Sequence, residues 1–179
     1  MSENKTITLP NGKTISVTPM LVSFVAMLLG AALLVLSLFT PFVEPTKEVR
    51  TGAAIFGVDA DEMKISLAEL SEAFSELSEF SGDSEMKTVF TVLTGLFVAF
   101  AALTVLLVLK KKPIGAMVFG ILFFALFTLI KAIIENGMEM PNDYLQWGSA
   151  SGFCTVGTII LVIGGILMIR AKKQVKQEA

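Results

Sequence analysis

The sequence predicts an all-α integral membrane protein, built as a left-handed bundle of four transmembrane helices. Three observations predict this fold class. The 179-residue chain is 54% hydrophobic and only 17% charged, with a mean hydropathy of +0.75. Four apolar runs reach the roughly 20 residues that a helix needs to cross a bilayer. These runs lack the strand-length alternation of an outer-membrane barrel. A soluble globular domain is excluded, because such domains carry about 25% charged residues.

The first 19 residues predict a small β-hairpin ahead of the first span. A three-residue loop, Pro10-Asn11-Gly12, places Ile7 opposite Ile15 and Leu9 opposite Lys13. In this register the apolar side chains of both strands share one face. A two-residue Asn-Gly loop leaves no apolar face, so we prefer the longer loop.

Four spans follow, and each is expected to be helical because lipid cannot satisfy unpaired backbone groups. Thr18 and Pro19 supply an N-cap and a first helical residue for the first span, and Pro41 opposes its continuation. A turn at 110–113 is so short that the second and third spans must be antiparallel neighbours. The expected spans are residues 20–41, 89–109, 114–134 and 150–169, followed by a basic tail at 170–179.

The charges of the connecting segments predict the orientation. The N-terminal segment, the 110–113 turn and the C-terminal tail carry nine basic and two acidic residues. The two longer loops, at 42–88 and 135–149, together with Lys131 in the third span, carry five basic and fourteen acidic residues. Because Lys and Arg concentrate on the cytoplasmic side, both termini and the hairpin are expected in the cytoplasm and both loops outside.

The long outer loop predicts an amphipathic helix over residues 59–80. Its apolar residues recur at intervals of four and three, which is one stripe of a helix. Asp59 and Glu62 resemble a capping box at its start. The stripe has three possible partners: the outer mouth of the bundle, the bilayer surface, or another protein. As a candidate partner surface it comprises Met63, Leu67, Leu70, Phe74 and Leu77.

Two further features lie near the outer face. Residues 51–57 are apolar and flanked by glycines, which fits a short strand or a segment that dips to the bilayer surface. Tyr144 and Trp147, the only Tyr and Trp of the chain, stand where an interfacial aromatic belt is expected. Lys131 and Glu135 are four residues apart at the end of the third span, and we interpret them as interfacial anchors too.

Small residues predict where the helices pack, because association in lipid depends on close backbone approach. The first and last spans carry small residues at intervals of seven, and the second and third at intervals of four. We expect ordinary packing within the chain, with an oligomer seam as the alternative. The candidate packing residues are Ser23, Gly30, Ser37, Gly95, Ala99, Gly120, Ala150, Gly157 and Gly164.

The sequence offers little material for catalysis. It has no His and one Cys, Cys154, and no span contains Asn or Gln. Zinc sites, phosphate-binding loops and the common nucleophile motifs are therefore not expected, nor is any cofactor. The basic stretches fit lipid-headgroup contact rather than nucleic-acid binding.

Four spans with cytoplasmic termini, a larger first outer loop and a smaller second one resemble the claudin-like tetraspan layout. The resemblance is one of topology. The claudin signature of Trp, Gly-Leu-Trp and paired Cys is missing, since residues 42–88 contain neither Trp nor Cys. No residue role is carried over from that family.

These observations predict a non-enzymatic, multi-pass plasma-membrane protein, and the missing disulfide pair and outer sequon favour a bacterial one. We expect it to act as a scaffold, accessory subunit or immunity-type interaction protein through its acidic outer loop. Its partners would be the lipid bilayer and another membrane or extracellular protein, or a second copy of itself. The alternative is an oligomeric small channel or pore.

Overall fold

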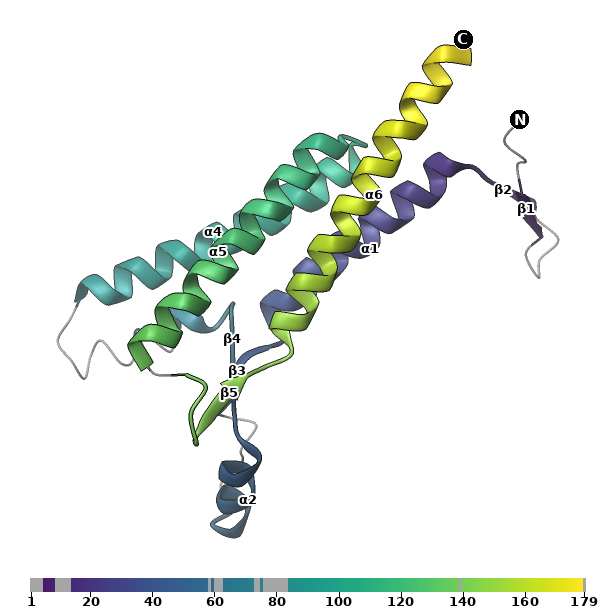
Figure 1. The fold of residues 1–179 in the computed structure, drawn as a ribbon. Coiled ribbons are helices and arrows are strands. Elements are labelled where there is room, and N and C mark those ends of the chain that lie inside the picture. The colour runs from purple at the N-terminus through teal and green to yellow at the C-terminus, as the bar shows by residue number, and fades with distance from the viewer. Residues whose placement is uncertain are drawn as a thin grey trace.

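Four long helices dominate the computed structural model, which describes residues 5–8, 14–57, 59, 63–72, 75, 84–138 and 140–178 (Figure 1). Each contains an apolar segment long and hydrophobic enough to cross a membrane. The prediction of four membrane-spanning helices is confirmed in this respect. The helices are α1 (Pro19–Phe39), α4 (Ser84–Leu109), α5 (Pro113–Met138) and α6 (Ala150–Glu178).

Helix α1 begins and ends where its sequence dictates. The hydroxyl of Thr18 accepts a hydrogen bond from the Leu21 N–H at 3.2 Å, and Pro19 occupies the first helical position. At the other end Thr40 adopts an extended conformation, and Pro41 follows it. Proline has no N–H to continue the helical ladder, so the chain turns directly into a strand.

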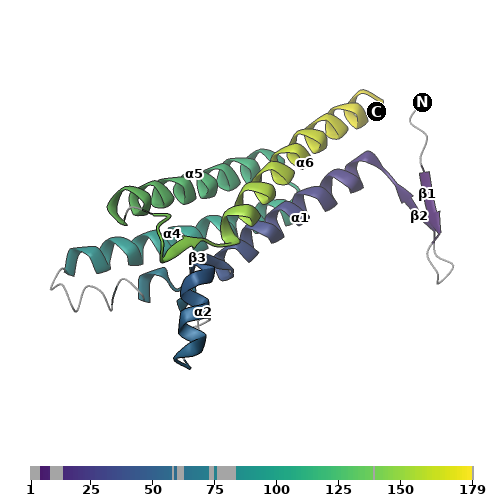
Figure 2. The same cartoon turned by 60° about the horizontal axis from the view of Figure 1, so that its bottom comes forward.

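The four helices form a closed ring of neighbours. Helix α1 packs most extensively on α6, α4 packs on α5, and contacts of α5 with α6 and of α1 with α4 complete the ring. The start of α1, the end of α6 and the α4–α5 turn lie at one end of the bundle, which we call the terminal end (Figures 1 and 2). The opposite end carries the short strands and is called the loop end.

The α1–α6 seam is built on glycine, as the seven-residue spacing predicts. A Cβ on Gly30 would lie 2.7 Å from the Gly157 carbonyl oxygen, and one on Gly164 would lie 2.9 Å from the Met27 nitrogen. Ser23, Ser37 and Ala150 are buried on the same two helices. Both serine hydroxyls donate to carbonyls of their own helix, so burial leaves them satisfied.

The other two helices follow the small-residue prediction only in part. A Cβ on Gly120 of α5 would collide with the Leu161 side chain of α6. This glycine therefore allows α6 to pack closely on α5, as predicted. Gly95 and Ala99 of α4 are exposed, and a Cβ on Gly95 would meet no atom of the described chain within 4 Å. Their assignment to packing within the chain is wrong, because α4 turns its large side chains Phe90 and Phe97 inward instead.

A three-stranded antiparallel sheet caps the loop end, in the order β4–β3–β5. Strand β3 (Pro41–Pro45) lies between β4 (Ile65–Ser66) and β5 (Leu145–Trp147), so it joins both loops. Val43 pairs with Ile65 on one side and with Trp147 on the other. Helix α2 (Lys47–Ile55) follows β3 directly. The sequence-based assignment contained neither the sheet nor α2.

The predicted continuous helix over residues 59–80 is wrong in its first half. Ile65 and Ser66 pair with β3, and residues 67–69 form a turn. Within the described part of this segment, α-helical structure is found at 70–72 and at Ser75. The physical reason is a capping box at Ser66 and Glu69. The Glu69 carboxylate accepts from the Ser66 N–H at 3.0 Å, and the Glu69 N–H donates back to the Ser66 hydroxyl at 3.3 Å.

A two-stranded hairpin precedes α1. Strand β1 (Lys5–Thr8) pairs antiparallel with β2 (Thr14–Val17), and Ile7 lies opposite Ile15. The expected Pro10-Asn11-Gly12 loop lies outside the described residues, so its turn type stays a prediction.

Candidate interaction surface at the loop end

The loop end rests on an aromatic cluster beneath the sheet. Phe42 of β3 is fully buried, and its ring meets Phe127 of α5 edge-on at a centroid distance of 5.2 Å. On its other side Phe42 packs against Trp147 of β5 at 5.3 Å. Lys131 of α5 places its ammonium 4.9 Å from the centre of the Trp147 ring. This cation–π contact pairs two of the residues predicted as interfacial anchors and ties the sheet to α5.

Close backbone approach fixes β5 against β3. A Cβ on Gly148 would collide with the Pro41 carbonyl, and the Gly148 N–H donates to the Phe42 carbonyl at 2.9 Å. Further along, the Thr46 N–H donates to the Tyr144 carbonyl at 3.0 Å, and the Thr46 hydroxyl donates to the Asp143 carbonyl at 2.8 Å. Two loops almost a hundred residues apart are thereby joined into one rigid layer.

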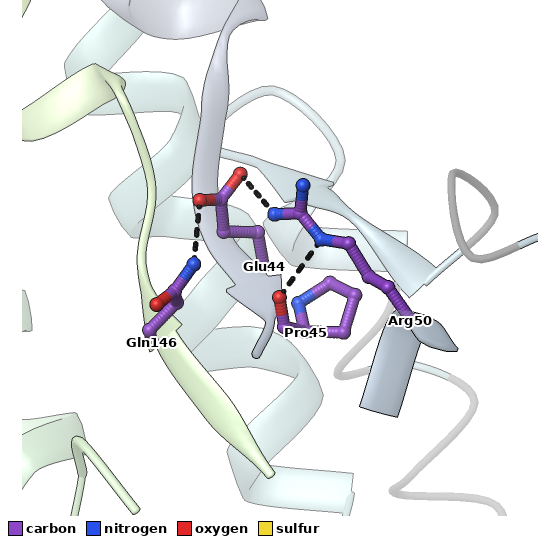
Figure 3. Close-up of polar contacts among 4 residues, drawn as sticks. All are labelled: Glu44, Pro45, Arg50 and Gln146. Carbon is purple, nitrogen blue, oxygen red and sulfur yellow. Dashed lines mark hydrogen bonds and ion pairs between the residues drawn. The ribbon is translucent and has the colours of Figure 1, made fainter. Parts of the chain in front are cut away.

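Polar contacts hold the start of α2 onto this layer (Figure 3). We call them the clasp, and they join Glu44, Pro45, Arg50 and Gln146. The Glu44 carboxylate forms an ion pair with the Arg50 guanidinium at 3.0 Å and accepts a hydrogen bond from the Gln146 amide at 3.0 Å. The Arg50 Nε–H also donates to the Pro45 carbonyl at 3.0 Å. The Arg50 side chain therefore contacts β3 twice, once at the Glu44 carboxylate and once at the Pro45 backbone carbonyl.

Beyond the clasp, α2 projects away from the bundle in both views (Figures 1 and 2). None of its residues, all of which the structure describes, is buried. At its tip Ile55 is 77% exposed and Phe56 is 84% exposed. Gly57, with a φ of 71°, ends the helix immediately afterwards. Two large apolar side chains thus stand at the end of a helix that buries none of its own residues.

The predicted partner stripe does not form one surface. Leu67 and Leu70 are buried against the bundle, and the Ala68 N–H donates to the Leu38 carbonyl at the end of α1. These two leucines match the alternative in which the stripe covers the outer mouth, and they are not accessible to a partner. Met63 is exposed. Phe74 and Leu77 lie outside the described residues.

The remaining predicted anchors, Tyr144 and Glu135, are exposed at the loop end.

The tip of α2 was not predicted from the sequence. Its one signal was the apolar run at 51–57, which is helical up to Ile55 and is not the short strand considered above.

In the described part of the chain, no group of three or more acidic or Cys side chains is placed to hold a metal ion. Cys154 is buried within α6. The exposed pair Ile55 and Phe56 at the tip of α2 is the candidate functional surface that the described residues present.

Comparison with protein-family models, curated proteins and solved structures gave no match. The claudin-like layout accordingly stays a resemblance of topology.

Proposed function

We propose that this chain is a non-enzymatic, multi-pass plasma-membrane protein of a bacterium that acts as a scaffold, accessory subunit or immunity-type interaction protein. The four apolar helices support the membrane location. The observation that carries the interaction role is the pair Ile55 and Phe56, exposed at the tip of α2. In this proposal the α2 tip replaces the stripe over 59–80 as the main contact surface.

The construction of the loop end supports this role. Exposed apolar side chains are common singly, but a projecting pair on a clasped helix is typical of a contact site. Aromatic and aliphatic anchors that enter a partner's pocket contribute most to protein–protein affinity. The rigid layer beneath α2 reduces the ordering cost of binding, because Arg50 and Glu44 already hold the helix.

The charge of the loop end indicates the chemistry of the partner. The two connecting segments at 42–88 and 135–149 contain most of the acidic residues of the chain. Complementary potentials favour association, so the partner is expected to carry a basic rim around an apolar pocket. In the proposed orientation the loop end faces outward and the basic terminal end faces the cytoplasm.

Site-specific photo-cross-linking in cells tests this proposal. A photoreactive amino acid at Phe56 is expected to yield a discrete cross-linked species that contains a second protein. The matched control is the same amino acid at Tyr144, which is also largely exposed at the same end. Adducts of equal yield at both positions, or adducts with lipid alone, would contradict a contact role for the α2 tip.

A second candidate function is an oligomeric small channel or pore. The observation in its favour is the exposed face of α4, where Gly95 and Ala99 are four residues apart and would allow a second copy to approach closely. Ion flux through the purified protein in liposomes, abolished by Gly95→Leu, would favour this function over the scaffold.

A further inference from the structure

An open cavity of about 510 Å³ lies at the terminal end, between the α4–α5 turn and α6. Its lining combines lysines from both elements with apolar residues. The lysines are Lys111, Lys112, Lys172 and Lys173, and the apolar walls include Pro113, Ile114 and Ile169.

The turn that carries the first two lysines has a fixed shape. The Lys111 N–H donates to the Val108 carbonyl and the Lys112 N–H donates to the Leu107 carbonyl, both at 2.9 Å. This is the Schellman arrangement, and its left-handed position is usually a glycine. Here it is Lys111, with a φ of 52°. The turn therefore retains a cation where a side chain is normally disfavoured.

The cations are distributed around the cavity in a defined way. The Lys172 ammonium donates to the Lys111 carbonyl, which ties α6 to the turn. The Lys111 ammonium lies 5.9 Å from the Phe24 ring on the α1 side. Lys112 and Lys173 are exposed at the cavity, and they are the cations best placed to close on an anion.

No acidic residue offsets this charge in the adjoining sequence. Residues 109–116 and 166–176 contain neither Asp nor Glu. Ile114 and Gly115, whose N–H groups belong to the first turn of α5, also line the cavity. Such groups have no carbonyl partner within the helix and add a partial positive charge. The cavity thus presents a positive field beside an apolar wall.

The position of the cavity along the bundle selects the kind of anion. The second span ends at Leu109 and the third begins at Pro113, so Lys111 and Lys112 lie at the level where these two spans end. Phospholipid headgroups occupy this level of a membrane. Ile114, which is 65% exposed, and Ile169 would face the glycerol and upper acyl chain. A soluble phosphate would leave that apolar wall unused.

We propose that this cavity is a binding site for one anionic phospholipid. Lys112 and Lys173 hold the phosphate, Lys172 adds its charge beside them, and the apolar wall holds the lipid body. Each lysine that contacts the phosphate makes a charge-assisted hydrogen bond, and the loss of one such bond weakens binding by roughly tenfold.

Native mass spectrometry of the purified full-length protein tests the site. The protein is titrated with phosphatidylglycerol, with phosphatidylcholine of the same acyl chains, and with inorganic phosphate. Phosphatidylglycerol is expected to bind at one saturable site, and Lys112→Gln/Lys173→Gln is expected to weaken it about tenfold or more. The matched control, Lys110→Gln/Arg170→Gln, removes equal charge outside this cavity and is expected to change the affinity less than about twofold. Lys112→Arg/Lys173→Arg is expected to retain binding.

Three outcomes would overturn the proposal. An equal loss of affinity for phosphatidylglycerol in the cavity variant and the control variant would show that the lipid is attracted by the basic surface as a whole and not by this cavity. Phosphatidylcholine binding as tightly as phosphatidylglycerol would remove the role of the lysines. Phosphate binding that matches or displaces the lipid would identify a soluble anion as the ligand.

Discussion

Gly30 of α1 and Gly157 of α6 lie directly opposite each other, so close that a methyl group on Gly30 would stand 2.7 Å from the Gly157 carbonyl oxygen. The same methyl would stand 2.6 Å from the Leu161 nitrogen. Both obstacles are backbone atoms, which cannot rotate away. The α1–α6 seam therefore depends on the absence of a side chain at this point.

Gly30→Ala is expected to destabilise the bundle by about 1–3 kcal/mol, the usual range for overpacking a close contact. The measurement is unfolding of the detergent-solubilised protein by SDS titration. Gly152→Ala is the control, because a Cβ there meets nothing within 4 Å in the described part of the chain. An equal loss of stability in the two variants would contradict the close packing of α1 on α6 at Gly30.

Leu67→Ala is expected to lower the free energy of unfolding by about 2–5 kcal/mol, because it leaves a cavity at a fully buried position. Met63→Ala changes an exposed residue of the same segment, and it is expected to change the free energy of unfolding by less than about 0.5 kcal/mol. Thermal unfolding of both variants measures the difference. If Leu67 proved as tolerant as Met63, the segment would not be docked on the bundle.

Acidification is expected to loosen the segment around Ser66. Hydrogen bonds from the Ser66 N–H and hydroxyl stabilise the Glu69 carboxylate and hold its pKa below the ordinary value of 4.5. A lowered pKa in the folded state adds stability that is fully present above pH 4.5 and is lost as the pH falls through the lower folded pKa. Hydrogen-exchange protection of Leu70 should therefore decrease below pH 4.5.

Glu69→Gln is the control for that titration. It removes the ionisable group, so its protection should be lower at neutral pH and should change less between pH 6 and pH 3. A pH response equal to that of the unmodified protein would assign the effect to another group.

Arg50→Ala is expected to free α2 from the sheet, because it removes the ion pair to Glu44 and the bond to the Pro45 carbonyl. The effect on global stability should be below about 1 kcal/mol, as for other partly exposed pairs. A spin label on Ile55→Cys, in a Cys154→Ala background, should show faster motion in this variant. Lys47→Ala, at an exposed position of the same helix, should leave the label unchanged.

The four spans were predictable because a lipid bilayer requires long apolar helices, and the sequence contains four apolar runs of the required length. The pairing of the helices was only partly predictable. Gly30 and Gly157 marked a true seam, whereas Gly95 faced outward. A span that is apolar on every side has no hydropathy contrast to show which face is buried.

The loop end was less predictable for two physical reasons. The sheet joins β3 to β5 across about a hundred residues, and such pairing leaves no local periodicity in short strands. The stripe over 59–80 did contain buried leucines, but a regular spacing does not locate the start of a helix. The Ser66–Glu69 capping box was the better local signal for that start.

Cysteine labelling of intact cells tests most directly the claim that the loop end, which carries the α2 tip, lies outside the membrane. Single cysteines at Tyr144 and Lys173 are placed in the Cys154→Ala background and treated with a membrane-impermeant maleimide. Tyr144 is exposed at the loop end and is not part of the proposed contact at Ile55 and Phe56. We expect labelling of Tyr144→Cys on intact cells and of Lys173→Cys only after lysis. Labelling of Lys173→Cys on intact cells, with Tyr144→Cys protected until lysis, would contradict this orientation.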